Sequence, residues 1–218
     1  MATLGHPEPL MSKKLIRETF DVEFNNKNAD TDTEWHAGIE EDKTTLLISF
    51  EGTTSVTDWI SNFRLATTAY KNMSEKFYVH TGFLKKWKSV KDTIMGQIRD
   101  SGCSKIKLRG LSQGGAVALL CHENIKFHMP ELDVNTVVLG CPRVFGKKGY
   151  DTIASRCQDT IRIINGNDVV PRLPYSFMGY KHVGTKIVLG SRSSWLFCGY
   201  FGFCHKIDAY KKAIESHS

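Results

Sequence analysis

A serine placed between two glycines is the feature that most constrains how this chain can fold. The segment Gly110-Leu111-Ser112-Gln113-Gly114 stands between an apolar run at 106–108 and a helix-like run at 116–120. This Gly-x-Ser-x-Gly pattern is typical of a tight turn that joins a buried strand to a helix. Glycines are needed because the turn is strained and the helix passes close to the strand. The pattern therefore predicts an elbow that presents Ser112 at the end of a strand.

A serine in such an elbow is a candidate nucleophile. Its hydroxyl reacts poorly until a neighbouring base takes the proton and donors stabilise the developing oxyanion. The backbone N–H of Gln113, at the start of the following helix, supplies one such donor. The elbow therefore indicates an enzyme that transfers acyl groups.

Apolar runs and amphipathic segments alternate along the chain. Strands are predicted at residues 34–39, 44–50, from 105 to the elbow, 136–139, 160–164 and 186–190. Helices are predicted at residues 57–63, 82–99, from the elbow to about 127, and 205–216. Strands that alternate with helices of this length predict an α/β fold, with a mainly parallel central sheet and helices on both faces.

The length of 218 residues suits one domain at 16–218, preceded by a Pro-containing arm at 1–15. The longest apolar stretch, 195–204, is far shorter than the roughly 20 residues of a membrane span. No secretory leader is apparent, and the six cysteines form no CxxC pair. We therefore expect reduced thiols and a cytoplasmic protein that can bind peripherally to membrane surfaces.

Composition argues against two other classes of function. The net charge of +6 is spread along the chain without a dense basic run, which indicates a solvated surface rather than a nucleic-acid interface. Residues 140–147 have one residue too many for a phosphate-binding loop and no Ser or Thr after the lysine. No histidine pair has metal-ligand spacing on a helix, so neither a metal nor a cofactor is expected.

A serine nucleophile needs a histidine base, and the base needs an anion that holds its tautomer. Asp168 is the best anion because it follows the predicted strand at 160–164 directly; the alternative is an aspartate that caps its own turn. Two histidines follow Asp168, and either one completes the chain order Ser, Asp, His of an α/β-hydrolase. His205 is favoured because it lies between an apolar loop and the last helix, whereas His182 leads directly into a strand.

With these residues in view, the chain resembles the class 3 lipase family, the fungal triacylglycerol-lipase type of α/β-hydrolase. The resemblance covers about residues 34–210, and its blocks match in order at 48–59, 79–83, 110–116, 139–146 and 164–174. It implies an α/β-hydrolase fold. It also implies the roles of nucleophile, acid and base for Ser112, Asp168 and His205, and a structural role for His182.

The same resemblance implies an oxyanion hole formed by Thr53 and Gln113. Two departures concern this region. Leu111 and Gln113 stand beside the serine where the family usually has His and Leu, and Glu51 replaces the usual Arg before the glycine at 52. Backbone donors survive both changes, so the departures affect the polarity of the pocket rather than the chemistry.

The predicted function is hydrolysis of carboxylic esters of lipids, either acylglycerols or phospholipids, through an acyl-enzyme. The altered neighbours of the serine leave open an alternative, an inactive hydrolase fold that binds lipid or protein. Trp195 and Phe197, just before His205, would line an acyl-chain wall or enter a lipid interface, unless this loop is core. The resemblance also implies a movable lid at 57–63, which makes Trp59 a candidate substrate contact.

Overall fold

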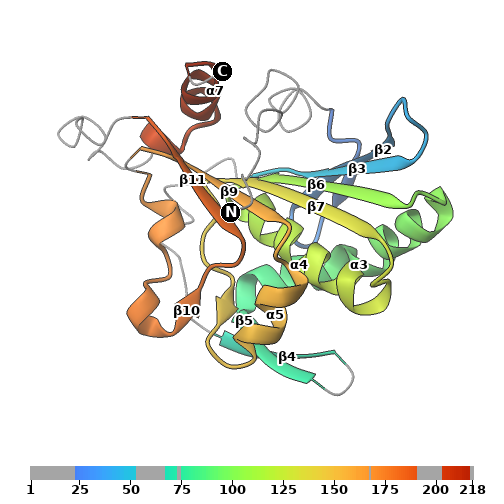
Figure 1. Ribbon diagram of the computed structural model, residues 1–218, viewed down its shortest axis with the longest axis horizontal. Coiled ribbons are helices and arrows are strands. Elements are labelled where there is room, and N and C mark those ends of the chain that lie inside the picture. Colours follow the sequence, from blue (N-terminus) through green and yellow to red (C-terminus); the bar gives the residue numbers. More distant parts are fainter. Residues whose placement is uncertain (1–22, 53–66, 73–74, 167, 191–202, 217–218) are drawn as a thin grey trace, which may run out of the picture.

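The computed structural model describes residues 23–52, 67–72, 75–166, 168–190 and 203–216. Its main element is a seven-stranded sheet in the order β1-β2-β3-β6-β7-β9-β11 (Figure 1). Neighbouring strands are parallel from β3 to β11, and only β1 and β2 are antiparallel to their neighbours. The predicted, mainly parallel sheet is therefore confirmed. The strands are β1 (Asn26–Asn28), β2 (Thr33–Ile39), β3 (Thr45–Phe50), β6 (Lys105–Leu111), β7 (Asp133–Leu139), β9 (Thr160–Asn165) and β11 (Thr185–Leu189).

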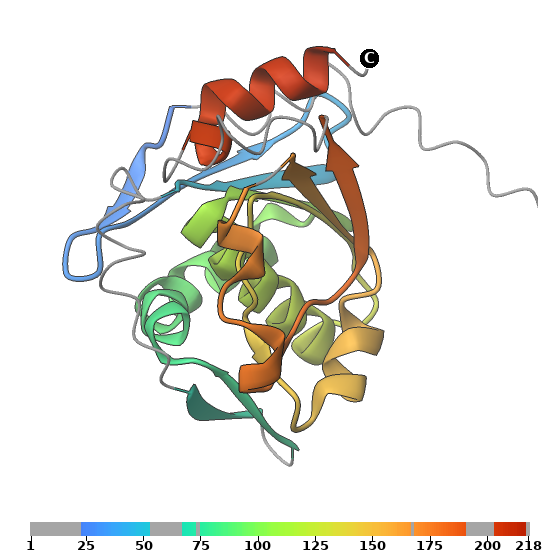
Figure 2. The same cartoon turned by 90° about the vertical axis from the view of Figure 1, so that its left-hand side faces the viewer.

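Helices cover both faces of this sheet, as predicted. Of the described α-helices, Figures 1 and 2 show α7 (Ile207–Glu215) on one face, and α3 (Thr81–Ser101), α4 (Ser112–His128) and α5 (Tyr150–Arg156) on the other. The larger hydrophobic core fills the side of α3 and α4, and a smaller core lies beneath α7.

Burial explains why the elements on either side of the elbow form where they do. Every residue of β3 is buried, which accounts for its unbroken apolar sequence. Helix α3 buries one stripe at helical spacing, with Phe83, Trp87 and Ile94 fully inaccessible. Helix α4 is buried on nearly all sides, because it lies between the sheet and its neighbouring helices.

A second, four-stranded antiparallel sheet was not predicted from the sequence. Its order is β10-β8-β5-β4, and two of its strands have only two residues, which is too short for a periodic pattern. The strands are β4 (Thr67–Asn72), β5 (Glu75–His80), β8 (Phe145–Gly146) and β10 (Tyr180–Lys181). The sheet lies beside α5, away from the central sheet (Figure 1).

Three short 3-10 helices complete the described elements: η2 (Val170–Arg172), η3 (Ser176–Met178) and η5 (Phe203–His205). The closing helix was predicted from residue 205, but α7 begins at Ile207, because His205 belongs to η5. The predicted arm at 1–15 and the predicted helix at 57–63 lie outside the described residues.

Candidate active site

The elbow has the strained geometry that its sequence predicts. Ser112 follows β6 directly, begins α4, and has φ +55°, in the left-handed region that a non-glycine residue adopts at a cost of about 1–2 kcal/mol. Close approach explains the flanking glycines. A Cβ on Gly114 would lie 2.3 Å from the carbonyl oxygen of Glu51, and one on Gly110 would lie 2.5 Å from the backbone of Gly114. Only glycines let α4 begin this close to the strand ends.

Asp168 and His205 form a buried pair, although 37 residues separate them. The distance from His205 Nδ1 to Asp168 Oδ2 is 2.7 Å, and each residue is 2% exposed. The other carboxylate oxygen, Oδ1, accepts a hydrogen bond of 2.9 Å from the backbone N–H of Val170. A carboxylate at Nδ1 requires a proton on that nitrogen, so Nε2 of neutral His205 is left as a proton acceptor.

Tyr210 is a third member of this cluster that the sequence analysis did not assign. Its hydroxyl donates a hydrogen bond of 2.6 Å to Asp168 Oδ2 from the buried face of α7. Burial, together with the negative charge of Asp168, raises the pKa of Tyr210 well above its usual value, so the phenol remains a donor. The sequence signal was a tyrosine on the apolar face of a helix, because a buried hydroxyl needs a partner.

Gly140 brings this pair to the elbow. It follows β7, which is the neighbour of β6, with Leu139 opposite Leu111 in the register. Its φ is +56°, and a Cβ here would lie 2.7 Å from His205 Cε1 and 2.9 Å from Asp168 Oδ2. The imidazole therefore packs directly on the residue that stands beside Ser112 in the neighbouring strand.

Two polar atoms at this point have no partner. Ser112 Oγ and His205 Nε2 are both buried, and neither has a hydrogen-bond partner among the described residues. Several other buried atoms of the described residues share this state, but these two are a hydroxyl at the elbow and a nitrogen of the imidazole that packs on Gly140, in the neighbouring strand. A hydroxyl and an imidazole nitrogen held ready for a reacting group explain this state, because hydrogen bonds of this kind often form only with substrate bound.

The segment that carries His205 is attached to the end of β9. The Asn165 side chain donates a hydrogen bond of 3.0 Å to the carbonyl of Cys204, and its backbone carbonyl accepts one of 2.9 Å from the backbone N–H of Asp168. One asparagine thus holds both the acid and the segment of the imidazole. Cys204 is disulfide-bonded, so the expectation of six reduced thiols is wrong for this residue.

The other candidate base, His182, does not pair with Asp168. Its Nε2 donates a 2.7 Å hydrogen bond to the carbonyl oxygen of Pro171. Burial, followed by the positive charge of Arg162, lowers the pKa of His182 to about 3. His182 is therefore neutral at physiological pH and holds the loop after Asp168.

This burial predicts an acid-dependent loss of stability. Because the folded pKa of about 3 lies below the ordinary value of 6.5, the stability from neutral His182 is complete above pH 6.5 and is lost as the pH falls toward 3. Urea unfolding of the wild-type chain should therefore show a lower free energy at about pH 4.5 than at about pH 7, with about 2 kcal/mol due to His182.

His182→Gln keeps a donor for the Pro171 carbonyl but cannot be protonated. The difference in unfolding free energy between the two pH values should shrink by that amount in the variant. An unchanged difference would contradict the burial of a neutral imidazole at this position.

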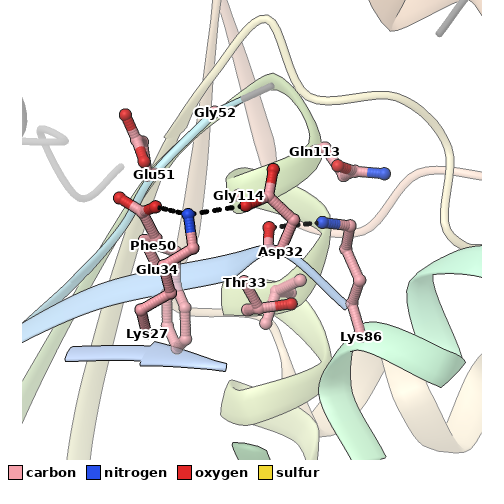
Figure 3. Close-up of a pocket in the computed structure, with 11 residues that line it drawn as sticks. Lys27, Asp32, Thr33, Glu34, Phe50, Glu51, Gly52, Lys86, Gln113 and Gly114 are labelled. Carbon is pink, nitrogen blue, oxygen red and sulfur yellow. Dashed lines mark hydrogen bonds and ion pairs between the residues drawn. The ribbon is translucent and has the colours of Figure 1, made fainter. Parts of the chain in front are cut away.

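On the oxyanion side, Gln113 lines a cavity of about 240 Å³ together with Gly52 and Gly114 (Figure 3). Gln113 is the second residue of α4, so its backbone N–H lies in the first helical turn. Thr53, the other predicted donor, lies outside the described residues, as do Trp59, Trp195 and Phe197.

The cavity is strongly polar where the sequence departs from the family. Burial, and then a hydrogen bond with Glu34, raises the pKa of Glu51 to about 7. Lys27 lies 2.7 Å from Asp32 and pairs also with Glu34, as Figure 3 shows. Glu51 therefore places a carboxyl group with a raised pKa where the family usually has a cation. In the part of the chain that the structure describes, no cluster of three or more His, Cys, Asp or Glu could hold a metal ion.

Sequence comparison supplies relatives for this constellation. Residues 47–178 match the family model described as lipase (class 3). The lipase of Rhizomucor miehei is 30% identical over 147 residues, which cover 64% of this chain and 40% of the relative. Secreted mono- and diacylglycerol lipase 1 of Fusarium solani is 29% identical over 141 residues, 63% of this chain and 41% of the relative. The chain thus spans about two fifths of the length of these curated relatives.

Solved structures share the fold. The propeptide complex of Rhizomucor miehei lipase superposes with a TM-score of 0.69 at 26% identity, over 79% of this chain and 57% of that one. A second structure, described by the words "a serine protease triad forms the catalytic centre of a triacylglycerol lipase", has a TM-score of 0.68 at 26% identity, over 79% and 67% of the two chains. The predicted α/β-hydrolase fold is confirmed by these likenesses.

The relatives overturn the expected location. The similar proteins of Fusarium solani and Penicillium cyclopium are named secreted lipases, so the prediction of a cytoplasmic protein is wrong. The disulfide at Cys204 agrees with this correction, because disulfides persist in oxidising compartments. None of the helices in the described residues is both long enough and apolar enough to span a bilayer.

Proposed function

Because this chain belongs to the class 3 lipase family, we propose that it hydrolyses carboxylic esters of lipids through an acyl-enzyme formed on Ser112. One observation carries the proposal. Beside a serine strained to φ +55°, the buried Asp168–His205 pair leaves Nε2 of the imidazole without a partner among the described residues. This is the arrangement that activates a serine for attack on an acyl carbon.

In the first half-reaction, Ser112 Oγ attacks the ester carbonyl carbon while His205 Nε2 takes the hydroxyl proton. Asp168 holds the imidazole and stabilises its positive charge. The carbonyl oxygen becomes an oxyanion, which accepts a hydrogen bond from the backbone N–H of Gln113 and a second from Thr53. The oxyanion then collapses, the C–O bond to the alcohol breaks, and His205 returns the proton to the leaving oxygen.

In the second half-reaction, water replaces the alcohol. His205 takes a proton from the water as its oxygen attacks the acyl carbon, and the fatty acid leaves when Ser112 regains its proton. Residues 16–218 act as one domain in this scheme. Tyr210 is a positioning residue, because its hydroxyl holds Asp168 and its ring lies edge-on to the His205 ring, with centroids 6.5 Å apart.

The proposed substrates are acylglycerols or phospholipids presented at a lipid interface. The similar proteins are named lipases that act on acylglycerols, and another solved neighbour is described as a model for interfacial activation in lipases. That neighbour has a TM-score of 0.66 at 25% identity, over 79% of this chain and 67% of that one. Three carboxyl groups and two lysines line the cavity beside Gln113, so this side offers no surplus of positive charge to an anionic headgroup, which favours neutral acylglycerols there.

A panel of substrates tests this proposal. We expect release of fatty acid from a short-chain triglyceride, with a rate that rises when the substrate passes its aggregation threshold. Release from phosphatidylcholine is expected to be slower. A folded chain that hydrolyses no triglyceride, phospholipid or p-nitrophenyl ester would contradict the proposal and support the alternative of an inactive binding module.

A further inference from the structure

A second pocket, of about 350 Å³, lies on the face of the sheet opposite to α7. Alternate residues of β9 and β11 form its floor, and the segment with η2 forms its side. Arg162 stands opposite Lys186 in the parallel register, so their side chains share one face of the sheet. Arg143 and Arg172 also line the pocket, which thus collects four permanent cations.

These cations have no counter-ion in the described part of the chain. None of the four forms an ion pair with a described carboxylate. The one carboxyl group that lines the pocket is Asp168, and its oxygens already accept hydrogen bonds from His205, Tyr210 and the backbone of Val170. The pocket therefore sets four cations against the single carboxylate of Asp168, and its net charge is positive.

Arg162 is the most deeply placed of the four. It is only 8% exposed, and its Nε donates a hydrogen bond of 2.7 Å to the carbonyl of Val183. Its two terminal nitrogens make no hydrogen bond to any described residue. A buried guanidinium is costly unless its donors are satisfied, so the pocket is suited to an anion that accepts several of them.

Arg143 fixes the side of the pocket. Its guanidinium donates a hydrogen bond of 2.8 Å to the carbonyl of Pro174 and another to the carbonyl of Arg172. These bonds hold the segment of η2 against the pocket, and they place the Arg172 side chain at its exposed edge. Arg143 and Arg162 are thus held by the fold, which lowers the entropic cost of binding an anion.

Exposed apolar side chains follow directly along the chain. Tyr175, Phe177 and Met178 are 49%, 79% and 41% exposed, and the rings of the first two stack with centroids 5.3 Å apart. The orange segment that carries them lies next to β10 at the lower left of the molecule in Figure 1. Val188, which lines the pocket, is also exposed. Aromatic and apolar side chains next to cations are typical of surfaces that enter the boundary between headgroups and acyl chains.

We propose that this face docks on an anionic phospholipid surface, with a lipid phosphate in the pocket of Arg143, Arg162, Arg172 and Lys186. Tyr175, Phe177 and Met178 enter the acyl boundary beside it. Guanidinium groups donate bidentate hydrogen bonds to phosphate oxygens. A free anion would contact only the cations, whereas a lipid surface would also bury the neighbouring apolar side chains. Docking requires no bond to break, so it stands or falls separately from ester hydrolysis.

Vesicle binding tests the charged half of the site. The full chain is sedimented with phosphatidylcholine vesicles with and without about 30% phosphatidylserine. Arg172→Gln combined with Lys186→Gln should weaken binding to the anionic vesicles by about 30-fold, because each cation near such a surface contributes roughly fivefold. Hydrolysis of a soluble short-chain ester should not change.

A matched control replaces one arginine and one lysine near the amino-terminal ends of the parallel strands, away from the pocket. Arg99 and Lys105 are exposed there, at the end of α3 and the start of β6. Arg99→Gln combined with Lys105→Gln should weaken binding by less than about threefold, because these cations lie far from the docked surface. Equal weakening by the two pairs would overturn the proposed site in favour of net charge alone.

The apolar half is tested by Phe177→Ser, with Ile39→Ser as control at another exposed apolar residue. The first change should weaken binding to both kinds of vesicle about tenfold, and the second should not. A folded chain that does not sediment with anionic vesicles would overturn the proposal. So would thermal stabilisation by inorganic phosphate without vesicle binding, because it would show a site for a free anion.

Discussion

Ser112→Ala is expected to lower the rate of ester hydrolysis by at least about a thousandfold while the chain remains folded. The hydroxyl is the proposed nucleophile, and no other described serine begins a helix directly after a strand with a positive φ. Residual turnover would come from oxyanion donors and substrate binding. A fluorophosphonate probe measures the same loss directly, because it labels an activated serine: the wild-type chain should be labelled, and the variant should not.

The strain at residue 112 allows a control on folding. Ser112→Ala keeps a Cβ at φ +55°, whereas Ser112→Gly removes the steric cost of this conformation. We expect the glycine variant to be equally inactive and more stable than the alanine variant by about 1 kcal/mol in thermal unfolding. Labelling that persists in either variant would show that a different residue is the nucleophile.

Asp168→Asn is expected to lower kcat by about 10⁴-fold, with little change in KM. Oδ2 of Asp168 accepts hydrogen bonds from both His205 and Tyr210, while Oδ1 accepts one from the backbone N–H of Val170. An asparagine has only one acceptor oxygen. If that oxygen faces His205 and Tyr210, the amide N–H₂ faces the backbone N–H of Val170, which is also a donor. In the reverse orientation, the amide N–H₂ faces the two donors of His205 and Tyr210.

Neither orientation keeps His205 in the required tautomer without an unsatisfied buried donor, so the loss should appear in the chemical step. KM should change little because Asp168 does not contact the substrate. Asp159→Asn is the matched control, since that aspartate is exposed just before β9 and should leave kcat unchanged. Retention of more than about a tenth of wild-type kcat in the first variant would contradict the proposed role of Asp168.

The elbow and the central sheet could be predicted because their signals are local. Gly110 reports a contact with Gly114, four residues further along the chain, and the unbroken apolar run of β3 reports burial on both faces of one strand. Parallel order then follows from the alternation of strands and helices. The same logic predicts Ser112 and Asp168 at the carboxyl ends of strands.

The second sheet and the start of α7 could not be predicted, because non-local contacts decide them. Strands β8 and β10 have two residues each and exist only through their pairing with each other, and β8 also pairs with β5. His205 belongs to η5 rather than to the last helix, and this segment is attached through Asn165 to the end of β9. A periodic pattern carries no information about such attachments.

Sequence alone determined the kind of chemistry, because a strained serine elbow and a following acid are local patterns with a mechanical reason. Only the tertiary structure determined which side chains surround the serine and the acid. It set His205 rather than His182 against Asp168, added Tyr210 as a second donor, and gathered four cations on the far face of β9 and β11. The physical reason is that hydrogen-bond partners and uncompensated charges are properties of distances between remote residues, which packing fixes and spacing along the chain does not.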